Sequence, residues 1–456
     1  MLDFVTNILR GHPTASAAAE PATATLPEPA PAETDPLATI GVRHCQRLPD
    51  TAGENTGGTP CGGRPGPLDI DALLGRPAVS LDTPELQRFL AGKVILVTGA
   101  GGSIGSEICR QMMRFCPARL VLLDQAENAL FEIDRELRER WVGAELVPVV
   151  ADIGDAVRIG NIFRKHRPEV VFHAAAHKHV PMMESNPGEA IKNNVLGTKT
   201  VADAALANGT AAFVLISTDK AVNPTSVMGA AKRCAELYVQ SLNRGSGFRV
   251  QGSANMVLTT EPRTPNPGTR FVAVRFGNVL GSSGSVVPIF QKQIAAGGPV
   301  TVTHPDMKRF FMTIPEAAQL VMQAAAIARG GEIFVLDMGQ PVRILDLAGE
   351  MIRRSGLTVD EDIQIVFTGT RPGEKLYEEL ANDTDRTAPT SHEKIRVWEL
   401  PPATPEQAHE MVRMLSAVTD ASGDEVRLAL KRFVPEYQSP ALPVPPMRVV
   451  CDSAAA

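Results

Sequence analysis

Short runs of apolar residues alternate with longer stretches of helical pattern through the middle of the chain, and this alternation limits the folds open to it. The runs are KVILVTGA, RLVLLD, ELVPVVAD, VVFHAAA, FVLIS and FVAVRF. Strands that are apolar nearly throughout are buried on both faces, which is typical of a parallel sheet with helices above and below. The sequence therefore predicts an α/β fold built on a doubly wound parallel sheet.

Changes in composition mark the regions on either side of this pattern. The first part of the chain is rich in Ala, Pro, Thr and Gly. Such a composition buries too little apolar surface to offset the entropy of ordering. We expect a disordered tail at 1–67, a docking segment and lead-in helix at 68–92, the main domain at 93–280 with a surface insertion at 244–269, a smaller substrate-binding part at 281–400, C-terminal helices at 401–438 and a flexible tail at 439–456.

Charge and cysteine spacing argue against several classes of protein. The formal net charge is -6, whereas nucleic-acid-binding domains usually carry a basic surplus. The cysteines form no C-x-x-C pair, so we expect reduced thiols in the cytoplasm rather than a zinc site or disulfides. His177 and His179 lack further ligands nearby in the sequence, and we expect no metal there. The apolar segments are shorter than the ~18 residues of a membrane span, so we expect no transmembrane segment.

A glycine-rich loop follows the first apolar run, in VILVTGAGGSIGSEICRQM. Its pattern is T-G-x-x-G-x-x-G, between a strand and an amphipathic helix. Gly99 permits the tight turn, Gly102 lets the backbone approach a pyrophosphate, and Gly105 allows the helix to pack closely on the strand. The pyrophosphate then meets the N–H groups at the positive end of the helix. The loop predicts a Rossmann-type dinucleotide site.

Acidic residues end the next two apolar runs. Asp124 ends RLVLLD, 124 − 105 = 19 residues after the last glycine of the loop, where an acid holds the adenosine ribose. A carboxylate there would repel a 2′-phosphate, so NAD is favoured over NADP. Asp152 ends the third run, and we expect it to contact the adenine ring. Either acid alone is equally consistent with a helix cap or a turn.

Seven motifs occur in one order along the chain and identify a family. They are TGAGGSIGSE, HAAAHKHVPMMESNP, NNVLGT, STDKAVNPTSVMGAAKR, RFGNVLGSSGSVVPIF, HPDMKRFFM and RPGEKLYEEL. Together they resemble the nucleotide-sugar 4,6-dehydratases of bacterial polysaccharide biosynthesis, the CapD-like branch of the extended short-chain dehydrogenases/reductases. The resemblance covers roughly residues 68–400. It implies that 93–280 binds NAD, that 281–400 binds a UDP-sugar, and that the protein is a homo-oligomer.

Enzymes of this family remove water from the hexose of a nucleotide sugar. NAD takes a hydride from C4, the new ketone acidifies the C5 proton, and a base removes this proton while an acid protonates the departing C6 hydroxyl; the hydride then returns to C6. The resemblance makes Asp219 the acid and Lys220 the base. A Lys of ordinary pKa is a poor base at neutral pH. We therefore expect burial, or the nearby Lys232, to lower the pKa of Lys220.

One position departs from the wider superfamily. Short-chain dehydrogenases carry a Tyr four residues before the Lys, but here Met228 precedes Lys232, and a thioether cannot exchange a proton. Met at this place resembles the retaining UDP-N-acetylglucosamine dehydratases. Thr218 is then expected to hydrogen-bond the C4 hydroxyl, with Asp219 or a water taking its proton, and Lys232 to hold the nicotinamide ribose. Met228 itself fills volume.

The resemblance also assigns the binding residues. Those expected at the cofactor are Gly99, Gly102, Ser103, Ile104, Gly105, Asp124, Asp152, Ile153, Ala174, Ala175, Lys178 and Lys232. Those expected at the substrate are Lys178, Asn278, Arg309, Arg371 and Glu374. The two arginines suit a diphosphate, because Arg binds phosphate oxygens in bidentate fashion, and Glu374 suits a ribose hydroxyl.

The favoured function is an NAD-dependent UDP-N-acetylhexosamine 4,6-dehydratase, a hydro-lyase. Two alternatives stay open: a nucleotide-sugar 4-epimerase, and an NAD-sensing protein that has lost catalysis. An epimerase uses the Tyr for C4 chemistry and needs no acid–base pair at C5 and C6. A sensor has no need for Asp219, Lys220 and Lys232 together. The residues do not decide which hexosamine is used, the configuration at C5 or the role of the N-terminal tail.

Overall fold

The computed structural model describes residues 46–47, 83–243, 268–379, 387–398 and 403–439. The tail predicted at 1–67, the insertion predicted at 244–269 and the tail predicted at 439–456 therefore lie almost wholly outside the described residues. Within the first of these, β1 (Gln46–Arg47) pairs antiparallel with β4 (Trp141–Val142). These two residues form a strand, although the composition predicts disorder there.

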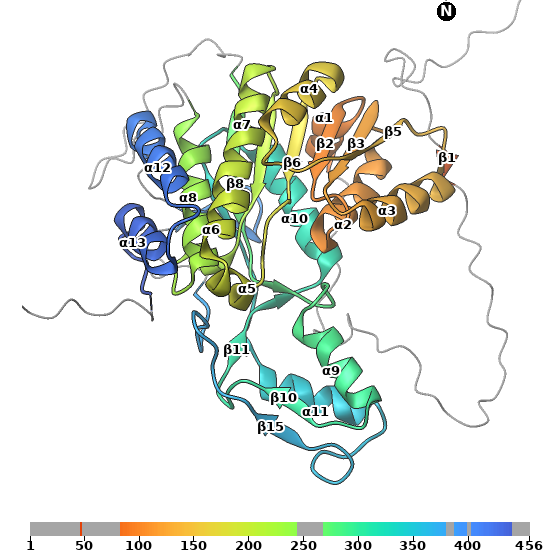
Figure 1. The fold of residues 1–456 in the computed structure, drawn as a ribbon. Coiled ribbons are helices and arrows are strands. Elements are labelled where there is room, and N and C mark those ends of the chain that lie inside the picture. The colour runs from red at the N-terminus through yellow and green to blue at the C-terminus, as the bar shows by residue number, and fades with distance from the viewer. Residues whose placement is uncertain (1–45, 48–82, 244–267, 380–386, 399–402, 440–456) are drawn as a thin grey trace, which may run out of the picture. The chain divides into compact units, whose positions relative to one another are not determined.

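A nine-stranded sheet forms the centre of the described chain (Figure 1). Its strands, in spatial order, are β16 (Thr387–Pro389), β17 (Ile395–Trp398), β13 (Ile333–Leu336), β8 (Arg270–Arg275), β7 (Ala212–Ile216), β6 (Val170–His173), β2 (Val94–Thr98), β3 (Arg119–Asp124) and β5 (Leu146–Val150). Neighbours from β13 to β5 are parallel, whereas β17 and β16 are antiparallel. The six apolar runs are β2, β3, β5, β6, β7 and β8, so the predicted doubly wound sheet is confirmed.

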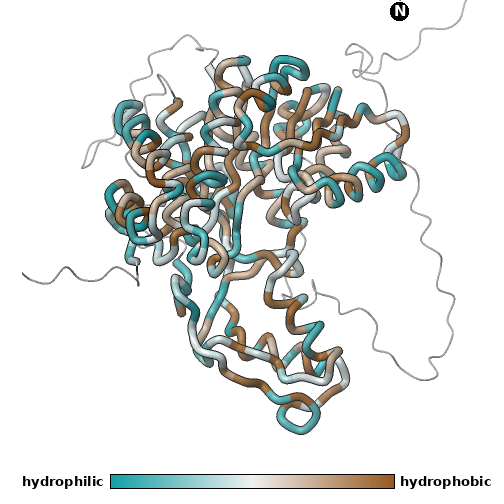
Figure 2. The backbone as a smooth tube through the Cα atoms, viewed as in Figure 1, coloured by the Kyte–Doolittle hydropathy of each residue, from teal (hydrophilic) through white to brown (hydrophobic). Residues whose placement is uncertain are grey.

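Helices cover both faces of the sheet, each over its own apolar core. One face carries α1 (Pro84–Leu90), α2 (Ser103–Met112), α3 (Glu127–Arg140) and α10 (Ile314–Ile327). The other carries α4 (Ala156–His166), α7 (Thr198–Ala207), α8 (Val227–Ser241), α12 (Pro405–Ala417) and α13 (Gly423–Phe433). Figure 2 shows apolar backbone along the central strands and polar positions on the outer sides of the helices. None of the helices formed by the described residues is long and apolar enough to cross a membrane.

The strand β5 differs from the other apolar runs. Its residues alternate between buried and partly exposed, and Val150 is 47% exposed. The prediction that every run is buried on both faces is wrong for this strand. It lies at the edge of the sheet, where it has one neighbouring strand.

A smaller lobe stands at the carboxyl end of the strands (Figure 1). It has its own apolar core and consists of α9 (Val286–Ala295), β10 (Val300–Val302), β11 (Lys308–Arg309), β14 (Val342–Arg343), α11 (Ile344–Arg354) and β15 (Ile365–Phe367). Two short strands, β9 (Asn278–Val279) and β12 (Phe311–Met312), pair beside it. The segment 281–400 is thus divided between the lobe and the main domain: β13, β16 and β17 belong to the nine-stranded sheet, and α10 packs against one face of it. The expected boundary at residue 280 does not coincide with the end of the sheet.

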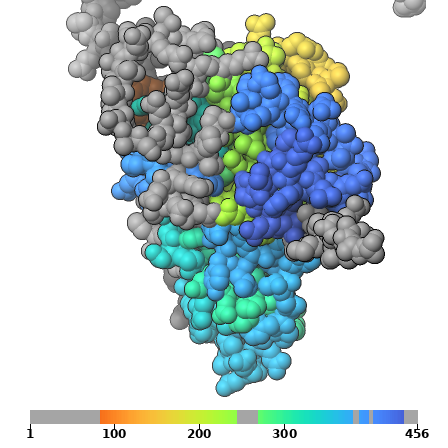
Figure 3. All heavy atoms as spheres, turned by 90° about the vertical axis from the view of Figure 1, so that its left-hand side faces the viewer, coloured from red at the N-terminus to blue at the C-terminus, as the bar shows by residue number. Residues whose placement is uncertain are grey.

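The last two helices, α12 and α13, pack against α8, and Figure 3 shows them in dark blue beside the green surface of that region. Two ion pairs join these segments. Arg427 on α13 contacts Glu184 of α5 (Val180–Ser185), and Glu184 accepts the N–H of Val227 at 2.6 Å. Arg233 on α8 contacts Glu436 just beyond α13. The N-terminus of α8 is therefore capped by a carboxylate that the C-terminal region holds in place.

Candidate active site

The glycine loop lies where the strand order reverses, between β2 and its neighbours β3 and β6. Gly99 has φ +66°, and a Cβ there would lie 2.7 Å from the nitrogen of Ala175. A Cβ on Gly105 would lie 2.0 Å from the carbonyl oxygen of Gly99. Neither position has room for a side chain, so the loop brings its backbone close to the sheet. Ligands of open α/β sheets bind at such a crossover point.

A cavity of about 570 Å³ opens beside this loop and the end of β3. The predicted cofactor residues that line it are Gly99, Gly102, Ser103, Asp124, Ile153, Ala174 and Ala175. Asp124 accepts the N–H groups of Gly101 and Ala126, both at 2.9 Å, and its carboxylate still has lone pairs for a further donor. Asp152 does not line this cavity: it is exposed and accepts the N–H of Gly154 at 2.8 Å.

A second cavity, of about 850 Å³, lies between the carboxyl ends of the strands and the smaller lobe. It shares Gly99, Gly102, Ser103 and Ala174 with the first, so the two adjoin. The other predicted residues in its wall are Ile104, Gly105, Lys178, Thr218, Lys220, Lys232, Asn278, Arg309, Arg371 and Glu374. Of the predicted catalytic residues, Asp219 alone does not line it.

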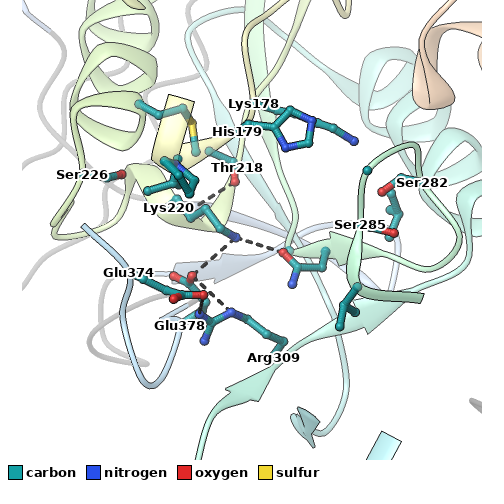
Figure 4. A pocket seen from close by; sticks show the side chains of 18 of the residues that line it. Lys178, His179, Thr218, Lys220, Ser226, Ser282, Ser285, Arg309, Glu374 and Glu378 are labelled. Carbon is teal, nitrogen blue, oxygen red and sulfur yellow. Dashed lines mark hydrogen bonds and ion pairs between the residues drawn. The ribbon is translucent and has the colours of Figure 1, made fainter. Parts of the chain in front are cut away.

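Lys220 reaches this cavity from a short 3-10 turn, Asp219–Ala221, directly after β7. Its Nζ lies 3.0 Å from Asp219 Oδ1 and 3.0 Å from Asn278 Oδ1. The same Nζ lies 3.5 Å from Glu378 Oε1 (Figure 4). Two carboxylates therefore flank one amine.

The charges around Lys220 decide its protonation. Burial lowers the pKa of Lys220, but the carboxylates of Asp219 and Glu378 outweigh burial, and the pKa is raised above its ordinary value. The expectation that burial or Lys232 lowers this pKa is wrong, because the charges of Asp219 and then Glu378 outweigh burial. At neutral pH Lys220 is an ammonium in this structure.

Asp219 lies behind Lys220, away from the cavity. The residue is 1% exposed, and its Oδ1 accepts the hydroxyl of Thr218 at 2.9 Å. Its Oδ2 has no hydrogen-bond partner among the described residues. That oxygen faces Gly277, where a Cβ would lie 3.0 Å away. Thr218, which does line the cavity, thus connects Asp219 with it.

The helix α8 supplies the other wall. Lys232 donates to the carbonyl of Ile216 at 2.7 Å, and burial lowers its pKa to about 8, although the charge of Glu236 partly opposes this. Met228 lines the cavity and belongs to the apolar core. A Cβ on Gly229 would lie 2.1 Å from the carbonyl oxygen of Lys220. The glycine therefore allows the turn that carries Lys220 to touch the helix.

A buried carboxylate stands behind β7. Both oxygens of Glu236 are hydrogen-bonded: they accept from Arg275, from Arg233 at 3.1 Å and from Ser217 at 2.7 Å. Burial raises the pKa of Glu236, but the arginines outweigh it and the pKa is lowered. Arg275 also lies over the ring of Trp398, 3.9 Å from its centroid. This cluster supports Ser217, the residue before Thr218.

The end of the cavity formed by β11 and the 371–379 segment is lined by several charged side chains. Arg309 is buried and donates to the carbonyls of Lys375 and Leu376. It also contacts Glu374 at 3.5 Å and Glu378 at 3.7 Å. These contacts join the strand β11 to the 371–379 segment. Sequence reasoning missed Glu378, although it lies in the quoted motif RPGEKLYEEL; only its neighbours in space distinguish it from Glu379.

Comparison with known proteins identifies the family of the chain. The family described as "Polysaccharide biosynthesis protein" matches residues 95–399. The chain is 54% identical over 329 residues to "Capsular polysaccharide biosynthesis protein CapD" of Staphylococcus aureus, covering 72% of this chain and 51% of that protein. It thus spans about half the length of that relative. It is 31% identical over 296 residues to "UDP-N-acetylglucosamine 4,6-dehydratase (inverting)" of Campylobacter jejuni, covering 64% of this chain and 79% of the relative.

A solved structure supports the fold. The X-ray structure of Pen from Bacillus thuringiensis superimposes with a TM-score of 0.60 at 32% identity, covering 69% of this chain and 90% of that one. The family match at residues 95–399 includes the glycine loop and the turn after β7 that carries Thr218 and Lys220. The resemblance seen in the motifs is therefore confirmed, and the chain belongs to the polysaccharide biosynthesis protein family.

Proposed function

We propose that the protein is an NAD-dependent nucleotide-sugar 4,6-dehydratase and that its substrate is UDP-N-acetylglucosamine. The observation that carries this proposal is the group of Thr218, Asp219 and Lys220 at the end of β7. Lys220 and Thr218 face a large cavity, while Met228 occupies the place of the usual Tyr. Acid–base groups in the wall and an apolar side chain at the Tyr position suit elimination better than simple C4 oxidation.

The cofactor proposed for the first cavity is NAD. The glycine loop has no room for side chains, and Asp124 offers a carboxylate at the expected place for the adenosine ribose. Gly102 and Ser103 lie at the N-terminus of α2, which favours a pyrophosphate. Lys232 and Lys178 are proposed to meet the nicotinamide ribose. Bound NAD supplies the hydride acceptor and donor; the chain supplies position and proton transfer.

The groups near β7 are proposed to move protons. Thr218 accepts a hydrogen bond from the C4 hydroxyl of the sugar and donates to Asp219 Oδ1, 2.9 Å away, so the C4 proton passes to Asp219. Asp219 and Lys220 then provide the proton that leaves with the C6 oxygen. Lys232 contributes positive charge beside C4. The resemblance gives Lys220 the further role of C5 base, which its raised pKa opposes.

The smaller lobe is proposed to hold the nucleotide. Arg371 lines the cavity, and its guanidinium makes no hydrogen bond among the residues that the structure describes. It is therefore available to a diphosphate. Arg309 supports the same region, with Glu374 and Asn278 beside it. The predicted homo-oligomer and the cytoplasmic location stay predictions.

The test is direct. Purified protein is incubated with UDP-N-acetylglucosamine and the nucleotide sugars are analysed by mass spectrometry. We expect a product lighter by one water. A galacto-isomer of unchanged mass would indicate the epimerase instead, and the complete absence of a new product with bound NAD present would indicate a sensor.

A further inference from the structure

Residues 371–379 connect the smaller lobe with the turn that carries Lys220. On one side, Arg309 of β11 donates to two backbone carbonyls of this segment, at 2.8 and 3.2 Å. On the other side, the Nζ of Lys375 donates at 3.0 Å to the carbonyl of Val222, which directly follows the turn. The segment thus reaches from the end of the cavity proposed for the nucleotide to the end that holds the amine.

Glu378 lies in this segment, between the cations of the two ends. Its side chain is 3% exposed, and its Oε1 lies 3.5 Å from the Nζ of Lys220 and 3.7 Å from the Nε of Arg309 (Figure 4). Asp219 and Asn278 also bind the amine, each at 3.0 Å. Among these partners in the described part of the chain, Glu378 is the one that also pairs with Arg309. A single buried carboxylate therefore links the two ends of the cavity.

We propose that Glu378 is a positioning residue for Lys220, which ties the amine to Arg309 while Asp219 changes its charge during turnover. This role rests on the proposed dehydratase function, in which Lys220 is the base at C5; Glu378 itself touches no reacting atom. When Asp219 takes the C4 proton, it no longer forms an ion pair with the amine. Glu378 keeps its charge at that stage and holds the amine in place.

The same carboxylate limits how easily Lys220 becomes a base. Burial and the charge of Arg309 lower the pKa of Lys220, whereas Asp219 and Glu378 raise it, and the raising effect prevails. Asn278, the partner from β9, is neutral. A base acts in its neutral form, so the share of Lys220 that can act grows with pH. Removal of the charge of Glu378 should lower the pKa and increase this share at any pH below it.

Competitive acylation measures the charge of Lys220 without a reaction on any sugar, because acetic anhydride reacts with the neutral amine. Protein loaded with NAD is treated with a trace of the reagent at several pH values, and mass spectrometry of the digest gives the rate for each lysine. Lys165 on the surface of α4 is the internal reference. The variants are Glu378→Gln, which removes the charge, Glu378→Asp, which keeps it on a shorter side chain, and Glu379→Gln as the matched control. Bound NAD and thermal unfolding show whether each variant is folded.

We expect Lys220 to be acylated about 10- to 10³-fold faster in Glu378→Gln than in the wild type at the same pH, because an opposite charge this close changes a pKa by about 1–3. The rise of kcat/KM with pH for UDP-N-acetylglucosamine should move to lower pH by the same amount. Glu378→Asp should keep the wild-type pH dependence with a lower kcat and a similar KM, since Glu374 still contacts Arg309. Glu379→Gln should match the wild type in the pH dependence of both measurements.

Equal acylation of Lys220 in the wild type and in Glu378→Gln would overturn this role, even if the variant eliminated no water, because the loss would then come from the fold. Faster acylation with an unchanged pH profile of elimination would also overturn it, because the charge of Lys220 would not limit the reaction. If the wild type eliminates no water although acylation responds as expected, the dehydratase function fails, and the ion pair has no part in such a reaction.

Discussion

Two buried groups of charged side chains meet at neighbouring residues after β7, and they differ in how completely they are paired. Ser217 joins the group around Glu236, in which both carboxylate oxygens are hydrogen-bonded. Thr218 joins the group around Lys220, in which Asp219 and Glu378 each keep one oxygen without a partner among the described residues. The first group supports the strand end, and the second is open to a reaction.

The comparison shows that the residues after β7 contact one group of charges that stabilises the fold and another that borders the cavity. A fully paired carboxylate holds its neighbours in place and stays charged, because each lone pair in use stabilises the ion. An incompletely paired carboxylate beside a cavity costs stability until a ligand donates to it. Changes in the first group should therefore act on folding, and changes in the second on the reaction.

The largest effect on stability is expected at Glu236. Glu236→Gln leaves Arg275 and Arg233 without their carboxylate, and breaking a buried ion pair from one side costs roughly 3–5 kcal/mol. Denaturant unfolding measures the loss. Glu410→Gln is the control, since its pair with Arg432 is exposed, and such pairs contribute about 1 kcal/mol or less. Equal losses in the two variants would mean that the buried cluster does not hold the strand end.

Lys232 lies one turn before Glu236, and its low pKa makes stability depend on pH. Its folded pKa is about 8 and the ordinary value is 10.5, so between these values the unfolded chain binds more protons and stability rises with pH. The rise from this group is about 1.4 kcal/mol for each pH unit. Lys232→Met should remove it, as unfolding at several pH values between 8 and 10.5 would show. A constant difference between wild type and variant across this range would contradict the assignment.

A medium effect is expected at Gly229, the contact between α8 and the turn of Lys220. Gly229→Ala places a methyl 2.1 Å from the Lys220 carbonyl oxygen, and overpacking of this kind costs roughly 1–3 kcal/mol. The displaced turn should also slow water elimination. Gly160→Ala is the control: Gly160 lies within α4, and a Cβ there would meet only the end of the Arg164 side chain, at an ordinary contact distance of 3.6 Å. This change should stabilise by roughly 0.5–1 kcal/mol. Full activity in Gly229→Ala would show that the turn tolerates displacement.

The smallest effect is expected at Met228. Met228→Leu keeps volume and apolar character, so it should cost less than about 1.5 kcal/mol and leave the elimination rate near that of the wild type. Rate measurements alongside thermal unfolding test this. A loss of rate of ~10²-fold or more, the size expected when an acid–base group is removed, would give the thioether a part in the proposed reaction that volume alone does not explain.

Much of the fold follows from the sequence pattern. The apolar runs predicted six strands of the sheet, and the glycine loop predicted the turn after β2. Pattern does not reveal which strands become neighbours, so the exposure of β5 at the edge and the return of β13 and β17 to the sheet were not foreseen. Both depend on contacts between residues far apart in the chain.

The sequence predicted which residues lie at the candidate site better than it predicted how their side chains are arranged around the cavity. Thr218 and Lys220 line the cavity as the motif predicted, but Asp219 between them does not line it and instead hydrogen-bonds both of these side chains from behind. Glu378 comes from a segment more than a hundred residues later, and the charges of Asp219 and Glu378 together raise the pKa of Lys220, against the expected shift. Sequence motifs identify reactive residues, whereas the electrostatic balance among them depends on the folded neighbours.

The cap on α8 has a consequence for the order of events during synthesis. The N–H of Val227 is bound by Glu184, and Glu184 is held by Arg427, which lies 243 residues beyond it. Glu184, which binds the N-terminus of the helix that carries Met228 and Lys232, therefore gains this partner only after the ribosome has translated 243 further residues. A chain that ended before α13 would retain the glycine loop but lack Arg427, the side chain that holds Glu184 at the N-terminus of α8.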